Sequence, residues 1–220
     1  NWTVTDTSHY TSTRQHKPLQ SKRRNKMMNS HNPPHIAAFL GHMPEIDDRA
    51  FIAPTAAVVG AVRIGADSSI WYQVTVRGDN HYVIIGAGTN IQDNSCIHIS
   101  SHEFPTIIGD HVSIGHSALV HACTLEDHSF VGMGAIVMDG AVIESDAMLA
   151  AGAMLTPRKR IPSGELWAGR PARKMRMLTP QDIADNHRIA RHYIEVGRAH
   201  KYGADGAPFH DMHSHPLPPR

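Results

Sequence analysis

Aliphatic residues recur at every sixth position through the middle of the chain. Steps of six from Ile52 meet only aliphatic residues, and three further runs with shifted phase begin at Ile85, Ile108 and Leu125. The positions are Ile52, Val58, Ile64, Ile70, Val76, Ile85, Ile91, Ile97, Ile108, Ile114, Val120, Leu125, Val131, Val137, Ile143, Leu149 and Leu155. An amphipathic helix would repeat near 3.6 residues and a half-buried strand every two. A period of six with turn residues between therefore predicts short strands joined by tight corners.

Three units of six residues close one triangular coil, in which each side is a short strand. Successive coils stack through parallel strand pairing about 4.8 Å apart, with the aliphatic side chains inside. The stretch from Ile52 to Leu155 holds five to six coils of 18 residues. We therefore predict an all-β fold, a parallel β-helix of hexapeptide repeats over residues 45–177.

A single α-helix is predicted after the repeats, over residues 178–203. Thr179 is a good N-cap, Pro180 suits the first helical position and Asp182 can cap at the third. The residues that form one face at helical spacing are Ile183, His187, Ala190 and Ile194. Gly203 ends the segment. Because one helix has no core of its own, we expect it to pack along the coils, on this subunit or on a neighbour.

The two ends of the chain differ from the repeats. Residues 1–44 are rich in Ser, Thr, Asn and His, with Asp6 as the one acid. Their basic residues are Arg14, Lys17, Lys22, Arg23, Arg24 and Lys26. Since this stretch holds no apolar segment of a secretory signal, we predict a flexible extension on a cytoplasmic protein, with a transit segment for the mitochondrial matrix as the alternative. Residues 204–220, rich in His and Pro, are predicted to be a solvated tail.

Composition and charge narrow the classes of function. Lys and Arg number 21 and Asp and Glu 20, and the net charge of +1 argues against a nucleic-acid partner. The two cysteines, Cys96 and Cys123, exclude a disulfide-dense secreted scaffold. No apolar run approaches the ~18 residues of a membrane span, so none is predicted. The 18 histidines raise the expectation of a metal site.

The repeat assigns each residue to one of three sides of the coil, which we name faces A, B and C. The interior positions are Val76, Ile97 and Val120 on face A, Ile85 and Ile108 on face B, and Ile91 and Ile114 on face C. Since strand side chains alternate, the residue after each interior aliphatic points outward. Arg77, His98 and His121 then stack on face A, with the two histidines one coil apart. Asp93 and His116 stack at the end of face C.

Histidines at this spacing are suited to holding one ion. Three neutral imidazoles plus one open position are a ligand set of catalytic zinc, which lowers the pKa of bound water to about 7. His116 lies on a different face from His98 and His121. One ion can therefore use all three only where another subunit brings its face C beside face A.

Several short motifs resemble the γ-class carbonic anhydrases and their close relatives over residues 45–200. They are Arg77-Gly78-Asp79, Asn90-Ile91-Gln92-Asp93, Cys96-Ile97-His98, and Gly115-His116 with His121 five residues on. The resemblance implies left-handed coils and a homotrimer with metal sites between adjacent subunits. It also implies that His98, His116 and His121 bind Zn²⁺, with Fe²⁺ or Co²⁺ as alternatives, two histidines coming from one subunit and one from the next.

The resemblance further implies roles for the neighbours of these histidines. Gln92 would hydrogen-bond the reacting water and orient it, and Asn90 would line the carbon dioxide pocket. Arg77 and Asp79 would form an ion pair between subunits, for which a purely structural role is the alternative. Asp93 would orient a ligand.

Turnover also needs a proton relay to solvent. The loop after His98, residues 99–105, is short, and the longer acidic loop that carries the shuttle in the archaeal prototype of the resembled family is missing. Tyr193, His102 and Glu103 are the candidates that remain, and each is equally suited to a packing or loop role.

Three classes of function follow from these observations. The leading one is zinc-dependent, reversible hydration of carbon dioxide to bicarbonate. The second is an acyl-CoA thioesterase or acyltransferase of the hexapeptide-repeat family, with the same metal site or a histidine base. The third is a carbonic-anhydrase-like assembly subunit of low activity, although the intact histidine trio argues against a wholly degenerate site.

Overall fold

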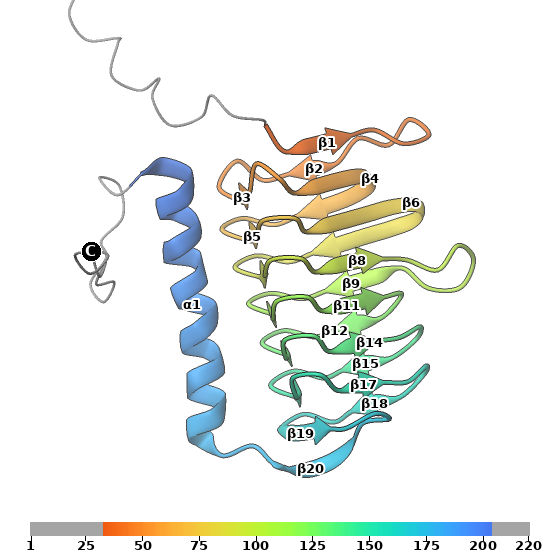
Figure 1. The fold of residues 1–220 in the computed structure, drawn as a ribbon, viewed down its shortest axis with the longest axis vertical. Helices are drawn as coiled ribbons and strands as arrows, with labels where there is room; N and C mark the ends of the chain where they lie inside the picture. Colours follow the sequence, from red (N-terminus) through yellow and green to blue (C-terminus); the bar gives the residue numbers. More distant parts are fainter. Residues whose placement is uncertain (1–32, 204–220) are drawn as a thin grey trace, which may run out of the picture. The chain divides into compact units, whose positions relative to one another are not determined.

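The computed structural model describes residues 33–203. They form a parallel β-helix with one α-helix, α1 (Pro180–Tyr202), along its side (Figure 1). The predicted all-β fold with a C-terminal helix is confirmed. The predicted tail at residues 204–220 and most of the predicted N-terminal extension, residues 1–32, lie outside the described residues.

Face C is a separate sheet of short strands. Its parallel strands are β3 (Phe51–Ile52), β5 (Ser69–Ile70), β7 (Asn90–Ile91), β10 (Ser113–Ile114), β13 (Phe130–Val131), β16 (Met148–Leu149) and β19 (Glu165–Ala168). Strand β20 (Arg173–Met177) pairs with β19 in the antiparallel sense and closes the sheet at its C-terminal edge.

Faces A and B form one sheet, because β4 (Ala57–Ile64) and β6 (Thr75–Ile85) continue around the corner between them. The other strands on face A are β1 (His35–Ala37), β8 (Cys96–His98), β11 (Leu119–His121), β14 (Ile136–Val137) and β17 (Met154–Leu155). Those on face B are β2 (Glu45–Ile46), β9 (Thr106–Ile108), β12 (Thr124–Leu125), β15 (Val142–Ile143) and β18 (Arg160–Ile161).

The predicted register is confirmed on all three faces. The interior residues pair as Val76–Ile97–Val120 on face A, Ile85–Ile108 on face B and Ile91–Ile114 on face C. Each predicted interior aliphatic except Ile52 is at most 1% exposed. The assignment of outward-facing residues to faces therefore rests on observed pairing.

The coils number about seven, since seven parallel strands follow one another on face C, so the prediction of five to six was too low. The count from aliphatic spacing began at Ile52 and stopped at Leu155. Ile36 in β1 pairs with β4 ahead of this range, and Trp167 in β19 pairs with β16 beyond it. Residues 35–37, which we had assigned to the extension, thus belong to the sheet.

Helix α1 has the predicted N-terminal cap. The Thr179 hydroxyl accepts a hydrogen bond from the Asp182 N–H at 3.1 Å, and the Asp182 carboxylate accepts one from the Thr179 N–H at 2.7 Å. The helix runs back along face C and packs against β3, β5, β7 and β10 (Figure 1). Ala190 is buried there, and Gly197 lies against Ser69. Within residues 33–203, no helix is both long and apolar enough to cross a membrane.

Three histidine rings stack where α1 crosses the turns that precede β10 and β13. His128 lies between His111 and His187 of α1, with ring centroids 5.1 and 4.2 Å apart. His187 Nε2 also lies 2.6 Å from Asp146 Oδ1, which ties the helix to the coils. Burial, followed by the charges of His187 and His111, lowers the pKa of His128.

We expect this arrangement to make the fold less stable in mild acid. Because the folded state lowers the pKa of His128, the unfolded chain binds its proton first as the pH falls below about 6.5. The free energy of unfolding should therefore decrease from about pH 6.5 down to the lowered, folded-state pKa. Urea unfolding at about pH 7.5 and about pH 5.5 measures the loss. His128→Asn should reduce it, since Asn tolerates the positive φ of 61°. An undiminished loss in the variant would contradict this role.

Candidate metal centre

Two imidazoles face each other on the outer side of face A. His98 ends β8, His121 ends β11, and the two residues are directly paired. His98 Nδ1 lies 3.3 Å from His121 Nε2. Two ligands about 2.05 Å from a tetrahedral zinc ion are also about 3.3 Å apart. The pair thus has the spacing of two ligands of one ion.

A carboxylate contacts the other nitrogen of each ring. Asp79 Oδ1 lies 3.1 Å from His98 Nε2, and Asp139 Oδ1 lies 2.7 Å from His121 Nδ1. Burial lowers the pKa of His98, although Asp79 opposes the effect. A neutral imidazole that donates its one N–H to a carboxylate keeps a lone pair on its second nitrogen. Both lone pairs then point into the space between the rings.

The third predicted ligand, His116, has the same kind of partner in another place. It follows β10 on face C, and its Nδ1 lies 2.9 Å from Asp93 Oδ2, in agreement with the predicted stacking of these residues. Among residues 33–203 of the chain, no three His, Cys, Asp or Glu side chains surround one point. One chain therefore brings two of the predicted ligands together and places the third on a different face.

Arg77 and Asp79 form an ion pair within one chain, whereas the resemblance implied an ion pair between subunits. The Asp79 carboxylate accepts hydrogen bonds from both Arg77 and His98, so it links the guanidinium to the imidazole. Burial raises the pKa of Asp79. The hydrogen bonds from His98 and the Asn80 N–H, with the charge of Arg77, outweigh burial and lower the pKa. Asp79 is therefore ionised near neutral pH and can hold the His98 ring in place.

Asn90 and Gln92 are buried and bonded to each other. Gln92 Nε2 donates to Asn90 Oδ1 at 3.0 Å, and Asn90 Nδ2 donates to Ser113 Oγ at 2.8 Å. Asn90 has no exposed surface, so within one chain it positions Gln92 and does not line an open pocket. The amide oxygen of Gln92 is not used in this pair.

Tyr193, one of the candidate proton shuttles, lies on α1 against Trp71, with ring centroids 5.6 Å apart. Burial, and then the negative charge of Asp93, raises the pKa of Tyr193 above its usual value. A phenol of raised pKa exchanges protons poorly near neutral pH. This environment favours packing as the role of Tyr193.

Comparison with known proteins adds to this geometry. Residues 122–157 match the family model "Hexapeptide repeat of succinyl-transferase". The chain is 51% identical over 162 residues to "Gamma carbonic anhydrase 1, mitochondrial" of Arabidopsis thaliana, covering 71% of this chain and 59% of that one. It is 40% identical over 166 residues to "Carbonic anhydrase" of Geobacillus kaustophilus, covering 76% of this chain and 91% of the relative. The chain belongs to the γ-class carbonic anhydrase family.

The solved structures agree on the fold of this γ-class family member. The crystal structure of a hexapeptide transferase family protein from Anaplasma phagocytophilum superposes with a TM-score of 0.72 at 48% identity, covering 75% of this chain and 97% of that one. The left-handed course of the coils follows from membership of this hexapeptide-repeat family. The chain spans about 59% of the length of the Arabidopsis relative.

Membership of the γ-class family implies a metal cofactor. The side chains of this chain fit one, because two imidazole nitrogens meet at a ligand–ligand distance and each ring is oriented by a carboxylate. Neutral imidazole is the form that binds metals, and the lowered pKa of His98 favours that form.

Asp139 is a residue of this site that was not predicted from the sequence. It lies one coil of 18 residues after His121, so an acid at that spacing was a usable signal. The pairing of β11 with β14 ends at Val137, and only the turn that follows brings the Asp139 carboxylate to His121. Register alone does not predict such a contact.

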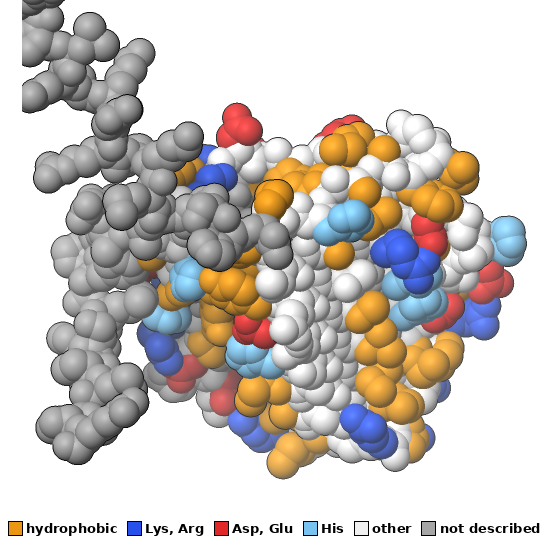
Figure 2. All heavy atoms as spheres, turned by 45° about the horizontal axis from the view of Figure 1, so that its top comes forward, with side chains coloured by type: hydrophobic (Ala, Val, Ile, Leu, Met, Phe, Trp, Pro, Cys, Tyr) orange, Lys and Arg blue, Asp and Glu red, His pale blue; other side chains and the backbone are white. Residues whose placement is uncertain are grey.

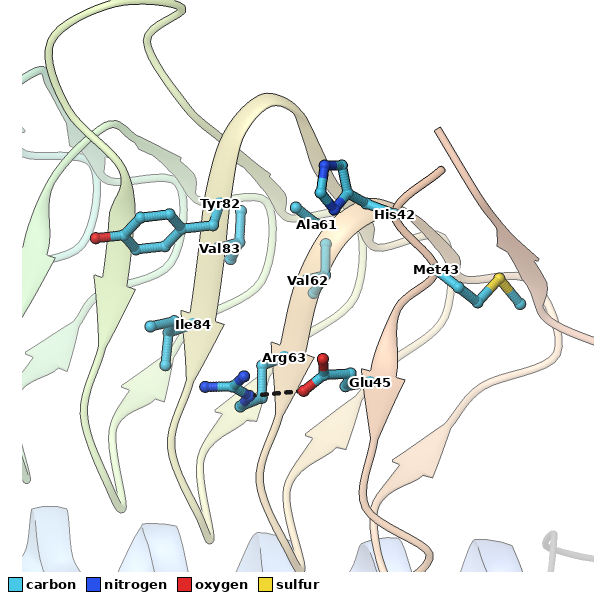
Figure 3. Close-up of a pocket in the computed structure, with 9 residues that line it drawn as sticks. All are labelled: His42, Met43, Glu45, Ala61, Val62, Arg63, Tyr82, Val83 and Ile84. Atoms are coloured by element: carbon cyan, nitrogen blue, oxygen red, sulfur yellow. Dashed lines mark hydrogen bonds and ion pairs between the residues drawn. The ribbon is translucent and has the colours of Figure 1, made fainter. Parts of the chain in front are cut away.

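A cavity of about 350 Å³ lies on face B, and none of these three histidines lines it (Figure 3). It is lined by His42, Met43, Glu45, Ala61, Val62, Arg63, Tyr82, Val83 and Ile84. Arg63 Nε donates to Glu45 Oε2 at 2.9 Å across neighbouring strands (Figure 3). Arg63 and Glu45 neutralise each other, and the described residues that line the cavity include no cluster of metal-binding side chains. We therefore do not assign carbon dioxide hydration to this cavity.

Proposed function

We propose that this chain catalyses the reversible hydration of carbon dioxide to bicarbonate at a zinc ion shared between subunits. His98 and His121 of one subunit and His116 of the next would hold the ion. The observation that carries the proposal is the pair of imidazole nitrogens 3.3 Å apart, each ring held by its own carboxylate. Imidazole also binds iron and cobalt, so Fe²⁺ and Co²⁺ are alternatives to zinc.

The surface beside these histidines supports a homotrimer. Leu119, Ile136 and Met154 occupy successive outward positions on face A, one above another. Leu119 is 38% exposed and shares β11 with His121, and Met133, one coil after His116 at the end of face C, is 58% exposed. Hydrophobic, acidic, basic and histidine side chains also lie close together on the side shown in Figure 2. A second copy covering such a stripe would bury apolar area and bring His116 to the pair.

Other residues of the chain would hold the ligand histidines in place and orient the reacting water. Held by these histidines, a zinc ion would supply Lewis acidity, which would bring the pKa of water toward neutrality. Asp79 and Asp139 hold the two rings on face A, and Asp93 holds His116. Gln92, fixed by Asn90, can accept a hydrogen bond through its amide oxygen and so orient the reacting water. Tyr193 packs against Trp71 and is given no role in proton transfer.

The names of the relatives bear on where the protein works. The Arabidopsis protein is called mitochondrial, and the basic, acid-poor composition of residues 1–44 is typical of a transit segment. We therefore propose the mitochondrial matrix as the compartment of this chain, which is the alternative to the predicted cytoplasmic location. Import of a tagged full chain into isolated mitochondria would test this placement.

A second candidate function is acyl transfer or hydrolysis of an acyl-CoA thioester. The description of the family model names a succinyl-transferase, and that of the Anaplasma structure names a transferase family. The family model and the Anaplasma structure share the coils with this chain. However, an acyltransferase that uses one histidine as a base does not need two imidazoles that converge on one point. The geometry therefore favours the metal.

Stopped-flow measurement of carbon dioxide hydration on a sample of known zinc content tests the leading proposal. We expect hydration that scales with zinc content, at about one ion per subunit. Acyl-CoA hydrolysis on the same sample should stay at background. Thioester turnover without hydration would replace the proposal by the second candidate.

The same assay tests Gln92. In Gln92→Ala, hydration should fall about 10- to 100-fold while zinc stays bound, because the variant removes an orienting group and no ligand. Gln181→Ala, an exposed glutamine on α1, is the matched control and should keep the wild-type rate. A wild-type rate in Gln92→Ala would leave this residue with a purely structural role.

A further inference from the structure

We infer that Asp139 is a positioning residue of the metal centre, which fixes the tautomer and the orientation of His121 so that Nε2 is presented to the ion. The inference rests on the proposed function in one respect only, that His121 is a metal ligand. No motif that carries the family resemblance contains Asp139.

The contact between the two side chains is short and one-to-one. Asp139 Oδ1 lies 2.7 Å from His121 Nδ1, the shortest separation among the three carboxylate–imidazole pairs of the site. Neutral imidazole has a single N–H, so donation from Nδ1 to Asp139 leaves Nε2 as the acceptor. That nitrogen is the one that lies 3.3 Å from His98 Nδ1.

The backbone around Asp139 is held on both sides. The Asp139 carbonyl accepts a hydrogen bond from the Arg158 N–H at 2.9 Å on the following coil. The Gly140 N–H donates to the Ala122 carbonyl at 2.7 Å on the preceding coil, next to His121. Gly140 has a φ of 66°, a conformation that glycine adopts without strain. The Asp139 carboxylate therefore sits on a fixed support one coil from its imidazole.

The neighbouring charged and reactive groups are engaged elsewhere. Arg158 Nη2 pairs with Glu103 Oε2 at 2.9 Å. The Asp79 carboxylate accepts hydrogen bonds from both Arg77 and His98, whereas the Asp139 carboxylate contacts the His121 ring. Cys123, two residues from His121, is only 2% exposed and packs in the core, so it does not compete with His121 as a ligand.

Such a carboxylate has a measurable effect on metal affinity. A charged acceptor behind the ring makes the ligand nitrogen more basic and prevents the ring from turning. Loss of a partner of this kind typically costs about 10- to 100-fold in metal affinity. The loss should therefore be measurable as a lower affinity for zinc, whether or not the protein hydrates carbon dioxide.

The test is zinc affinity by chelator competition on the full chain, for the wild type and for Asp139→Asn, which keeps the size of the side chain and removes its charge. We expect affinity to fall about 10- to 100-fold in Asp139→Asn and at least as far in Asp139→Ala. The visible absorption of the cobalt-loaded protein should also change, because the field at the ion changes with the basicity of His121. Asp185→Asn, an aspartate of α1 whose side chain is 44% exposed and pairs with Arg188, is the control and should bind as the wild type does.

The outcomes separate this inference from the proposed function. Equal zinc affinity and equal cobalt spectra in the wild type and both Asp139 variants would overturn the inference and leave the proposed function standing. Zinc binding that weakens in the variants, in a protein with no hydration of carbon dioxide, would overturn the proposed function and uphold the inference. Circular dichroism and thermal unfolding exclude loss of the coils as the cause of weaker binding.

Discussion

Replacing His121 with alanine should remove the metal and the hydration activity while the coils stay folded. Apparent zinc affinities of about 10–16 kcal/mol from four ligands amount to about 2.5–4 kcal/mol for each ligand, or two to three orders of magnitude in affinity. His121 lies outside the core, which is built from Val120 and the aliphatic residues stacked on it. Zinc analysis after gel filtration, with circular dichroism on the same sample, measures both effects.

The matched control is His42→Ala, a histidine that lines the face B cavity and is not one of the three predicted ligands (Figure 3). It should keep full zinc content. His98→Ala should behave as His121→Ala does, because each histidine supplies one of the two nitrogens of the pair. Full zinc occupancy in both His98→Ala and His121→Ala would show that this pair is not the metal site.

The face register could be predicted from the sequence because a β-helix keeps its phase. Ile97 and Val120 stand in the same interior column whatever the length of the loop between them. The residues that follow them, His98 and His121, are then placed by alternation alone. For the same reason the stacking of Asp93 with His116 could be predicted without knowledge of any side-chain conformation.

Contacts that depend on turns could not be predicted in this way. Asp79 lies in β6 beyond its pairing with β8, and Asp139 lies in the turn after β14, so strand spacing does not bring them to His98 and His121. The burial of Asn90 under α1 also follows from packing of a distant segment, since the helix is 90 residues further along the chain. The number of coils was underestimated for a related reason. Pairing at both ends continues through residues that the six-residue aliphatic spacing does not include.

The placement of the three histidines predicts that two inactive variants should complement each other. The His98→Ala subunit keeps His116, and the His116→Ala subunit keeps the His98–His121 pair. Each variant alone forms trimers without an intact site. When equal amounts are unfolded together and reassembled at random, a closed heterologous ring should contain roughly a quarter of its sites intact, one half times one half. Zinc content and hydration should rise together from near zero to about that fraction of the wild-type values.

A second mixture gives the decisive control. His98 and His121 lie side by side on one face of one chain. In a mixture of His98→Ala and His121→Ala subunits, every junction therefore carries a damaged pair, whatever the order of subunits in the ring. This mixture should regain neither zinc nor activity. Mass spectrometry of differently tagged chains should show the same extent of subunit exchange in both experiments. Recovery in the second mixture, or no recovery in the first despite exchange, would mean that the ligands are not divided between subunits as faces A and C require.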